Sequence, residues 1–304
     1  MVIMFRYKIR QLLNDFSLGH KLTSKRIFRQ AYLKKSVKQR LSQQNKLSYF
    51  ILNILDHCNL KCKGCDHFAS IADERFVLLD NIKKDLAQMS KILKGDFPRI
   101  GVMGGEPLLH PQLKEILIAT RLFFPKTIIE LVTNGILLLK QDEEFWRICR
   151  EQNIIISNTR YPINLDYKAM QETAAAHGVM FEYGRGTEKF PRYSYKKTLD
   201  IEGNQNPAKS FIECFGDNMY PLLMEGKLYG CTVAPNVRHF NKRFETNMEL
   251  EDGDSLDIYS VEKVSELVEF IGSPKQFCRY CDVRNRSFGH KWERARLEMS
   301  EWVK

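Results

Sequence analysis

The sequence predicts an α/β fold: a partial, open βα-barrel, a basic helical extension before it and a small C-terminal α+β domain after it. The main observation is an alternation, from residue 47 onward, of short apolar runs with amphipathic segments of helix length, which is the pattern of βα-repeats. Five such units can be counted, which is too few for a closed eight-fold barrel. With 304 residues, the chain is long enough for one large or two moderate domains.

Residues 1–46 form the basic extension. They contain 12 Lys and Arg residues against one acid, Asp15, whereas the net charge of the whole chain is +10. Apolar residues at helical spacing predict two amphipathic helices here, separated near Gly19. Such a segment can pack on the barrel as a lid, or dock on an anionic membrane surface, an RNA or a partner protein. No apolar stretch is long enough for a transmembrane segment or a secretory signal, so we expect a cytoplasmic protein.

The barrel elements follow in order along the chain. The predicted strands are residues 49–55, 100–103, 127–132, 154–158 and 179–183, with a sixth candidate at Thr198–Ile201. The predicted helices are one capped by Asp80 and closed by Gly95, one from Pro111 to before Pro125, one around Trp146 and one ending at Gly178. Cys149 falls on the third helix in an apolar setting and is expected to be a buried, inert thiol.

Three cysteines follow the first predicted strand. Cys58, Cys62 and Cys65 occur in the stretch CNLKCKGC, where Gly64 allows a tight loop. Thiolates at these spacings bind a soft metal ion or an iron–sulfur cluster. Three ligands leave one metal position open. The alternative is a closed zinc site in which His57 or His67 is the fourth ligand.

A second motif, Gly104-Gly105-Glu106-Pro107, follows the second predicted strand. A CxxxCxxC loop after the first strand and GGEP after the second resemble the radical SAM superfamily. The resemblance implies a partial (β/α)6 radical SAM barrel in which Cys58, Cys62 and Cys65 hold a 4Fe–4S cluster that binds S-adenosylmethionine (SAM). It also places a set of residues beside SAM. These are Gly104, Gly105 and Glu106 at its methionine end and Asn134, Ser157 and Asn158 near its ribose and methionine ends. For the last three, the alternative is an ordinary role in strand-end turns.

Four further cysteines lie beyond a predicted linker at Asn204–Pro207. Cys214, Cys231, Cys278 and Cys281 are enough to close a tetrahedral site of sulfur ligands. A hairpin before Cys231 and a CxxC pair at the end resemble the twitch or SPASM-like extensions of radical SAM enzymes, which implies an auxiliary 4Fe–4S cluster; structural zinc is the alternative. The predicted domains are therefore residues 1–46 (basic helical extension), 47–204 (radical SAM barrel), 205–290 (auxiliary cluster domain) and 291–304 (C-terminal helix).

The resemblance implies an enzyme that reductively cleaves SAM to a 5′-deoxyadenosyl radical, which abstracts hydrogen from a substrate. A low-potential donor such as flavodoxin or ferredoxin would supply the electron. An auxiliary cluster ligated only by thiolates suits electron transfer, so the leading hypothesis is an oxidoreductase that performs a net oxidation of a small polar molecule. The alternatives are a peptide maturase, an RNA-modifying enzyme that grips its substrate through residues 1–46, and a zinc-binding protein without enzymatic activity.

The residues after the fourth and fifth predicted strands suggest the kind of substrate. The candidates are Arg160, Tyr183, Arg185, Arg192, Tyr193 and Tyr195. Arginines in such positions suit a phosphate or a carboxylate, so we expect a sugar-like or phosphorylated small molecule.

Overall fold

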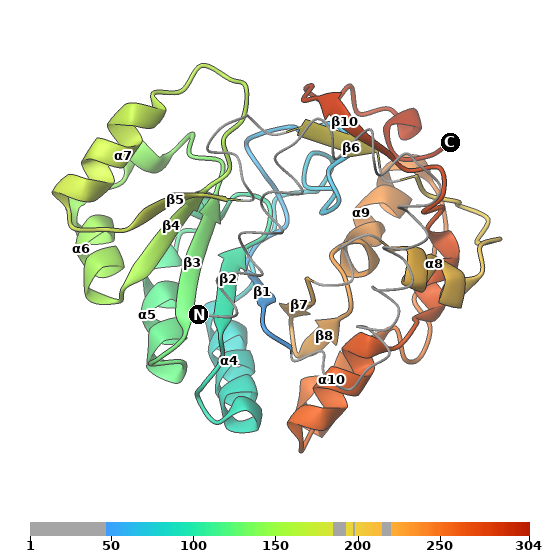
Figure 1. Ribbon diagram of the computed structural model, residues 1–304, viewed down its shortest axis with the longest axis horizontal. Helices are drawn as coiled ribbons and strands as arrows, with labels where there is room; N and C mark the ends of the chain where they lie inside the picture. Colours follow the sequence, from blue (N-terminus) through green and yellow to red (C-terminus); the bar gives the residue numbers. More distant parts are fainter. Residues whose placement is uncertain (1–46, 185–192, 197, 215–219) are drawn as a thin grey trace, which may run out of the picture.

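The computed structural model describes residues 47–184, 193–196, 198–214 and 220–304. The predicted helices of residues 1–46 lie outside these ranges. Within them, no helix is long and apolar enough to cross a membrane. The main feature is an eight-stranded sheet in the order β5-β4-β3-β2-β1-β7-β8-β9 (Figure 1).

The elements have the following bounds. The sheet contains β1 (Phe50–Asn53), β2 (Arg99–Met103), β3 (Ile128–Thr133), β4 (Ile154–Asn158), β5 (Phe181–Tyr183), β7 (Leu222–Met224), β8 (Lys227–Tyr229) and β9 (Ser255–Asp257). The helices are α4 (Leu79–Leu93), α5 (Leu113–Phe123), α6 (Glu143–Glu151), α7 (Tyr167–Ala176), α8 (Pro207–Glu213), α9 (Val233–Phe244) and α10 (Val264–Gly272). A separate antiparallel pair joins β6 (Tyr193–Lys196) to β10 (Ser287–Lys291).

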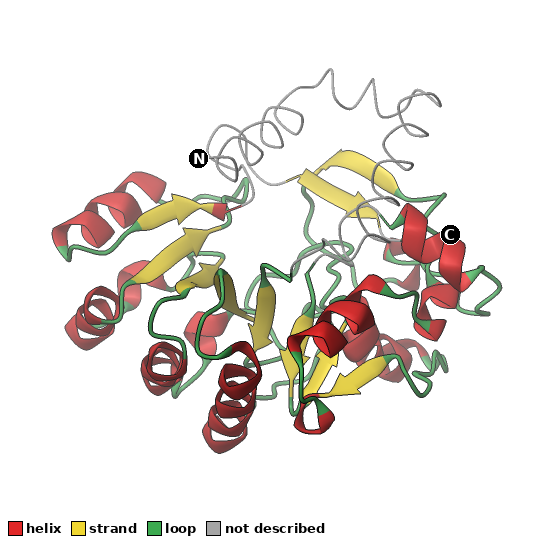
Figure 2. Ribbon diagram, turned by 60° about the horizontal axis from the view of Figure 1, so that its bottom comes forward, coloured by secondary structure: helices red, strands yellow, loops and turns green. Residues whose placement is uncertain are grey.

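Strands β1 to β5 pair in parallel, and helices α4 to α7 lie along one side of the curved sheet (Figure 2). These five strands confirm the predicted βα-repeat. Alternation along β1 explains the two faces, because Phe50 and Leu52 belong to the large core under the helices while Ile51 packs with Leu222 and Met224 on the other side. The carboxyl ends of the parallel strands therefore share one edge, where βα-barrels place their sites.

The predicted sixth strand at Thr198–Ile201 is wrong. Leu199 forms only isolated bridges, to Cys281 and Val303, and the position beside β1 is filled by β7, which pairs with it in parallel through Ile51 and Leu222. Strand β7 belongs to the hairpin that precedes Cys231, so this hairpin extends the sheet of the barrel. The sheet continues with antiparallel β8 and β9.

Two helix predictions also need correction. Asp80 is not the cap of α4, because the helix begins at Leu79 and Asp80 lies in its first turn, where a carboxylate still favours the helix dipole. The predicted C-terminal helix at 291–304 is wrong. That segment contains only a short 3-10 turn at Met299–Glu301, since the backbone before it pairs with the cysteine loop.

A second core joins the C-terminal part of the chain to the barrel. Phe68, from the segment after the cysteine loop, is 1% exposed and packs with Phe240 of α9 and Trp302 near the C-terminus. Ring centroids of Phe68 and Trp302 are 6.0 Å apart. The cysteine loop is thus held between the barrel core and this second core.

Candidate SAM and iron–sulfur site

The GGE turn lies directly against the chain that enters the cysteine loop. The backbone N–H of Gly105 donates to the carbonyl of Leu55 at 3.2 Å, and that of Glu106 donates to the carbonyl of His57 at 3.1 Å. A Cβ on Gly105 would lie 1.9 Å from the carbonyl oxygen of His57, and one on Gly104 would lie 2.2 Å from that of Leu55. Both glycines are therefore required by close backbone packing at the site.

Glu106 fixes this turn to the end of β3. Its buried carboxylate accepts hydrogen bonds from Thr133 Oγ1 at 2.6 Å, the Asn134 backbone N–H at 2.8 Å and the Leu108 backbone N–H at 3.1 Å. Burial raises the pKa of Glu106 to about 7, against the lowering effect of the three donors. The carboxylate is fully engaged by its own chain, so it shapes the turn and leaves the glycine backbone to face a ligand.

An open cavity, with about 630 Å³ of empty space that includes open solvent, brings the two motifs together. Its lining includes Cys58, Cys62 and Cys65 together with Gly104, Gly105 and Glu106. Asn134 also lines it; its Nδ2 donates to Asn59 Oδ1 at 2.8 Å and lies 3.7 Å from Cys58 Sγ. The predicted thiols, the GGE turn and Asn134 therefore share one cavity at the carboxyl edge of the sheet.

The three thiols of this cavity suit a cluster that needs anionic sulfur ligands. Gly64 has a left-handed φ of 66°, which turns the loop as its sequence predicted. Burial, with the nearby Asp66 and Cys62, raises the pKa of Cys65 to about 12, and burial with Glu106 raises that of Cys58. A metal or cluster would offset this penalty by binding the thiolates. Among the described residues, no three Cys, His, Asp or Glu side chains already converge on a single metal-ion position.

Ser157 and Asn158 are placed differently from the other predicted SAM neighbours. Neither lines the cavity. Asn158 is 0% exposed, and its Nδ2 donates to the Thr133 carbonyl at 3.4 Å, so it braces the end of β3. Asn158 Nδ2 would lie 2.4 Å from a Cβ on Gly135, which shows how tightly this turn is packed.

The cavity wall after β4 was missed from the sequence. Thr159 and Tyr161 line the cavity, whereas the predicted Arg160 between them does not and lies with its Cζ 5.5 Å from the ring centre of Tyr167. Alternation along an extended segment could have indicated this, since neighbouring side chains point to opposite sides. Tyr183 packs against the ring of Tyr167. Arg185 and Arg192 lie outside the described residues, as do the side chains of Tyr193 and Tyr195.

A C-terminal strap, residues 292–303, holds the cysteine loop and was also missed. The Lys63 backbone N–H donates to the carbonyl of Glu293 at 3.1 Å, and that of Ala295 donates to the carbonyl of Lys61 at 2.9 Å. The side chains of Lys63 and Glu293 form an ion pair at 2.6 Å. The indole Nε1–H of Trp302 donates to the carbonyl of Cys65 at 3.0 Å. The strap therefore contacts the cysteine loop at Lys61, Lys63 and Cys65.

The four C-terminal thiols gather on a different part of the chain. Burial, together with the charges of Cys231 and Cys214, raises the pKa of Cys278 to about 12. Burial also raises the pKa of Cys281, and the Arg286 guanidinium opposes that shift. Arg286 Nη1 lies 3.7 Å from Cys214 Sγ. Cys149 lies apart from both sets on α6, is 0% exposed, and is the buried core thiol that was predicted.

Comparisons with known proteins agree with this geometry. Residues 52–167 match the family described as the Radical SAM superfamily. A curated GTP 3′,8-cyclase from Trichodesmium erythraeum is 29% identical over 106 residues, which cover 34% of this chain and 32% of the relative. The chain thus spans about a third of the length of that relative.

Solved structures of lower similarity also align. BtrN in complex with AdoMet and 2-DOIA is 16% identical, with a TM-score of 0.47 over 77% of this chain and 92% of that one. Streptococcus suis SuiB bound to S-adenosylmethionine is 17% identical, with a TM-score of 0.36 over 58% and 43% of the two chains. The family match covers both motifs that line the cavity, the cysteine loop and the GGE turn. Residues 52–167 of the chain thus belong to the radical SAM superfamily.

Proposed function

We propose that this protein is a radical SAM oxidoreductase that performs a net oxidation of a small, polar, sugar-like or phosphorylated molecule. The observation that supports it most directly is the shared cavity, where Cys58, Cys62 and Cys65 face the GGE turn. Three thiolates are one ligand short of filling a 4Fe–4S cluster, so one iron would remain open for SAM. When bound, the cluster and SAM supply a 5′-deoxyadenosyl radical that abstracts hydrogen from the substrate.

The chain's own residues would bind and orient this cofactor. The backbone of Gly104 and Gly105 lines the cavity without side chains, which leaves room for the methionine end of SAM. Glu106 holds that backbone in place through Thr133 and Asn134. Thr159 and Tyr161 close the wall beyond β4 and would limit the access of water to reactive intermediates.

A second 4Fe–4S cluster in a twitch or SPASM-like domain is the other half of the proposal. Cys214, Cys231, Cys278 and Cys281 would hold it, and Arg286 beside Cys214 suits a site that carries thiolate charge. Such a cluster supplies an acceptor for one electron. Loss of a hydrogen atom to the 5′-deoxyadenosyl radical, then of one electron to this cluster and one proton to solvent, would amount to a net two-electron oxidation, for example of an alcohol to a carbonyl.

The remaining parts of the proposal concern partners and domains. We expect flavodoxin or ferredoxin as the low-potential donor, and the cytoplasm as the location. Residues 1–46, outside the described ranges, stay a predicted docking segment for a membrane surface, RNA or protein. The proposed domains are still 47–204 for the barrel and 205–290 for the auxiliary domain, with the hairpin of β7 and β8 shared between them through the sheet.

The test is an iron count on protein purified without oxygen. Two clusters predict about eight iron atoms per chain and brown colour with broad absorption near ~400 nm. Cys58→Ala should remove about four irons and abolish SAM cleavage, and Cys278→Ala should remove the other four while SAM cleavage persists. Cys149→Ala is the matched control and should keep all the iron. A colourless protein that contains zinc would refute the proposal.

A further inference from the structure

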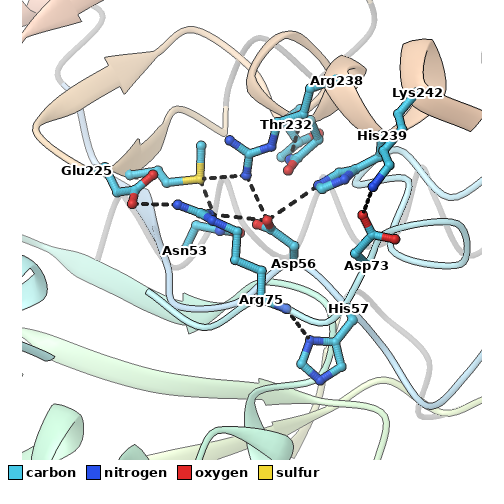
Figure 3. Close-up of polar contacts among 12 residues, drawn as sticks. Asn53, Asp56, His57, Asp73, Arg75, Glu225, Thr232, Arg238, His239 and Lys242 are labelled. Atoms are coloured by element: carbon cyan, nitrogen blue, oxygen red, sulfur yellow. Dashed lines mark hydrogen bonds and ion pairs between the residues drawn. The ribbon is translucent and has the colours of Figure 1, made fainter. Parts of the chain in front are cut away.

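A cluster of buried and half-buried polar side chains lies past the carboxyl ends of β1 and β7 (Figure 3). We call it the Asp56 cluster; its members are Asn53, Asp56, Arg75, Arg238 and His239. Asp56 is at its centre and its side chain is 0% exposed. One carboxylate oxygen, Oδ2, accepts from Arg75 Nη1 at 3.2 Å and from Arg238 Nη2 at 2.8 Å. Both arginines therefore hold the same oxygen.

Several buried polar atoms of this cluster have no hydrogen-bond partner. They are Asp56 Oδ1, Asn53 Oδ1 and His239 Nε2, which is 3.5 Å from Asp56 Oδ2. Asn53 is 1% exposed, and its Nδ2 donates only to the weak acceptor Met224 Sδ, at 3.3 Å. A buried polar atom without a partner costs about 1–3 kcal/mol, and three at one place are unusual in a folded protein. A ligand that pairs with these atoms would remove this cost.

The cluster lies beside the cavity, although none of its members lines it. Asn53 is the register partner of Met103, which lines the cavity at the end of β2. From the other side, Thr232 Oγ1 donates to Asp66 Oδ2 at 3.3 Å, and Asp66 also lines the cavity. The cluster is therefore next to the proposed cofactor, where a target C–H bond has to be held.

The atoms of the cluster define what they can recognise. Asp56 Oδ1 and Asn53 Oδ1 are acceptors and require donors from a ligand. Arg75 and Arg238 have half-buried side chains, 35% and 40% exposed, with guanidinium N–H groups that can donate to ligand oxygens. The two arginine charges are balanced by the carboxylates of Asp56 and Glu225, the latter paired with Arg75 at 2.5 Å. Burial lowers the pKa of His239, so this side chain is neutral near pH 7.

We propose that the Asp56 cluster is the substrate-recognition site and that it takes a neutral, hydroxyl-rich ligand, whose hydroxyl groups donate to Asn53 and Asp56 and accept from Arg238. This inference rests on the proposed function and narrows it, because a sugar-like substrate is selected over a phosphorylated one. A phosphate dianion offers acceptors only, so a phosphate group at this site would leave the unpaired oxygens of Asn53 and Asp56 without donors and would meet the buried charge of Asp56.

The test uses the full chain with its iron reconstituted and SAM bound, and myo-inositol as the probe. Saturation-transfer NMR and calorimetry should show binding of myo-inositol and at least tenfold weaker binding of myo-inositol 1-phosphate. Asn53→Leu, which removes the unpaired oxygen at similar volume, should weaken myo-inositol binding about tenfold, while its thermal unfolding midpoint stays equal or rises. Arg238→Lys should weaken binding in the same direction.

The matched control is Lys242→Gln on the same helix, α9. Lys242 pairs with Asp73 at 2.5 Å on the surface, so this variant should bind myo-inositol as the wild type does. The inference is overturned if myo-inositol does not bind, if its phosphate binds better, or if Asn53→Leu gains stability with unchanged binding. Iron content and SAM affinity are measured on the same samples: if they are normal while myo-inositol binding fails, only this inference falls, and if they fail, the proposed function falls with it.

Discussion

The close packing of Gly105 on the cysteine loop gives a sharp prediction for Gly105→Ala. The new Cβ would lie 1.9 Å from the carbonyl oxygen of His57 and 2.3 Å from its carbon, so backbone has to move by more than 1 Å. The movement breaks the hydrogen bonds from Gly105 to Leu55 and from Glu106 to His57, at about 1 kcal/mol each. Overpacking adds about 1–3 kcal/mol, so the free energy of unfolding should fall by about 3–5 kcal/mol.

Gly101→Ala provides the matched control for this prediction. Its Cβ would also lie 1.9 Å from the nearest atom, but that atom is the hydroxyl oxygen of Tyr49, at the end of a side chain. Tyr49 can rotate away, at the loss of its 2.7 Å hydrogen bond to Glu130, which corresponds to about 1–2 kcal/mol. A contact of the same length should therefore lower the free energy of unfolding much less when the new Cβ meets a side chain than when it meets backbone.

Urea denaturation of both variants, with SAM binding measured by calorimetry on iron-reconstituted protein, tests this reasoning. Gly105→Ala should lose both stability and SAM affinity, the latter at least tenfold, because the turn moves away from the cysteine loop. Gly101→Ala should keep SAM affinity. Equal losses in the two variants, or wild-type SAM affinity in Gly105→Ala, would show that the backbone contact does not shape the site.

Three further predictions concern the GGE turn, the strap and the C-terminal thiols. Burial raises the pKa of Glu106 from 4.5 to about 7, so its buried charge destabilises the fold as the pH rises through this range. The free energy of unfolding of Glu106→Gln should therefore rise by up to about 3 kcal/mol relative to that of the wild type between pH 4.5 and 7. A difference in urea midpoints that does not change with pH would contradict this. Trp302→Phe keeps the ring packing but loses the donor to Cys65, so chelators should extract iron several-fold faster; unchanged extraction would mean that the strap does not hold the loop. Arg286→Gln removes a cation beside Cys214 and should lower the midpoint potential of the proposed auxiliary cluster by on the order of 50 mV in a redox titration monitored by EPR, whereas an unchanged potential would place that cluster elsewhere.

The parts of the fold that the sequence predicted are those with local signals. Strands β1 to β4 are apolar runs next to amphipathic helices, and the cysteine loop and GGE turn follow such strands directly. Parallel strands end at one edge of a sheet, and Cys58 and Glu106 each follow such a strand. Their convergence could therefore be expected from the order of strands and motifs along the chain. Cys149 was recognised as a core thiol because its neighbours on the helix are apolar.

The parts that were missed depend on contacts between distant segments. Strand β7 pairs with β1 across 171 positions, as the Asn53–Met224 contact illustrates, and no local pattern encodes that choice. The apolar residues of 292–302 fit a helix, but their backbone pairs with Lys61 and Lys63 instead, so tertiary contacts override the local preference. Asn158 has the residue type of a ligand-binding strand end, and only the packing around Gly135 shows that it braces the turn.

The pairing of the strap with the cysteine loop has a consequence for biosynthesis. Lys63 and Glu293 are separated by 230 positions, so at roughly 5–20 residues per second the ribosome needs about 10–50 s after making the loop before its partner segment is translated. During that interval Cys58, Cys62 and Cys65 have no strap to shape them. Loading of iron and sulfide is therefore expected after translation, onto a chain whose strap has already docked.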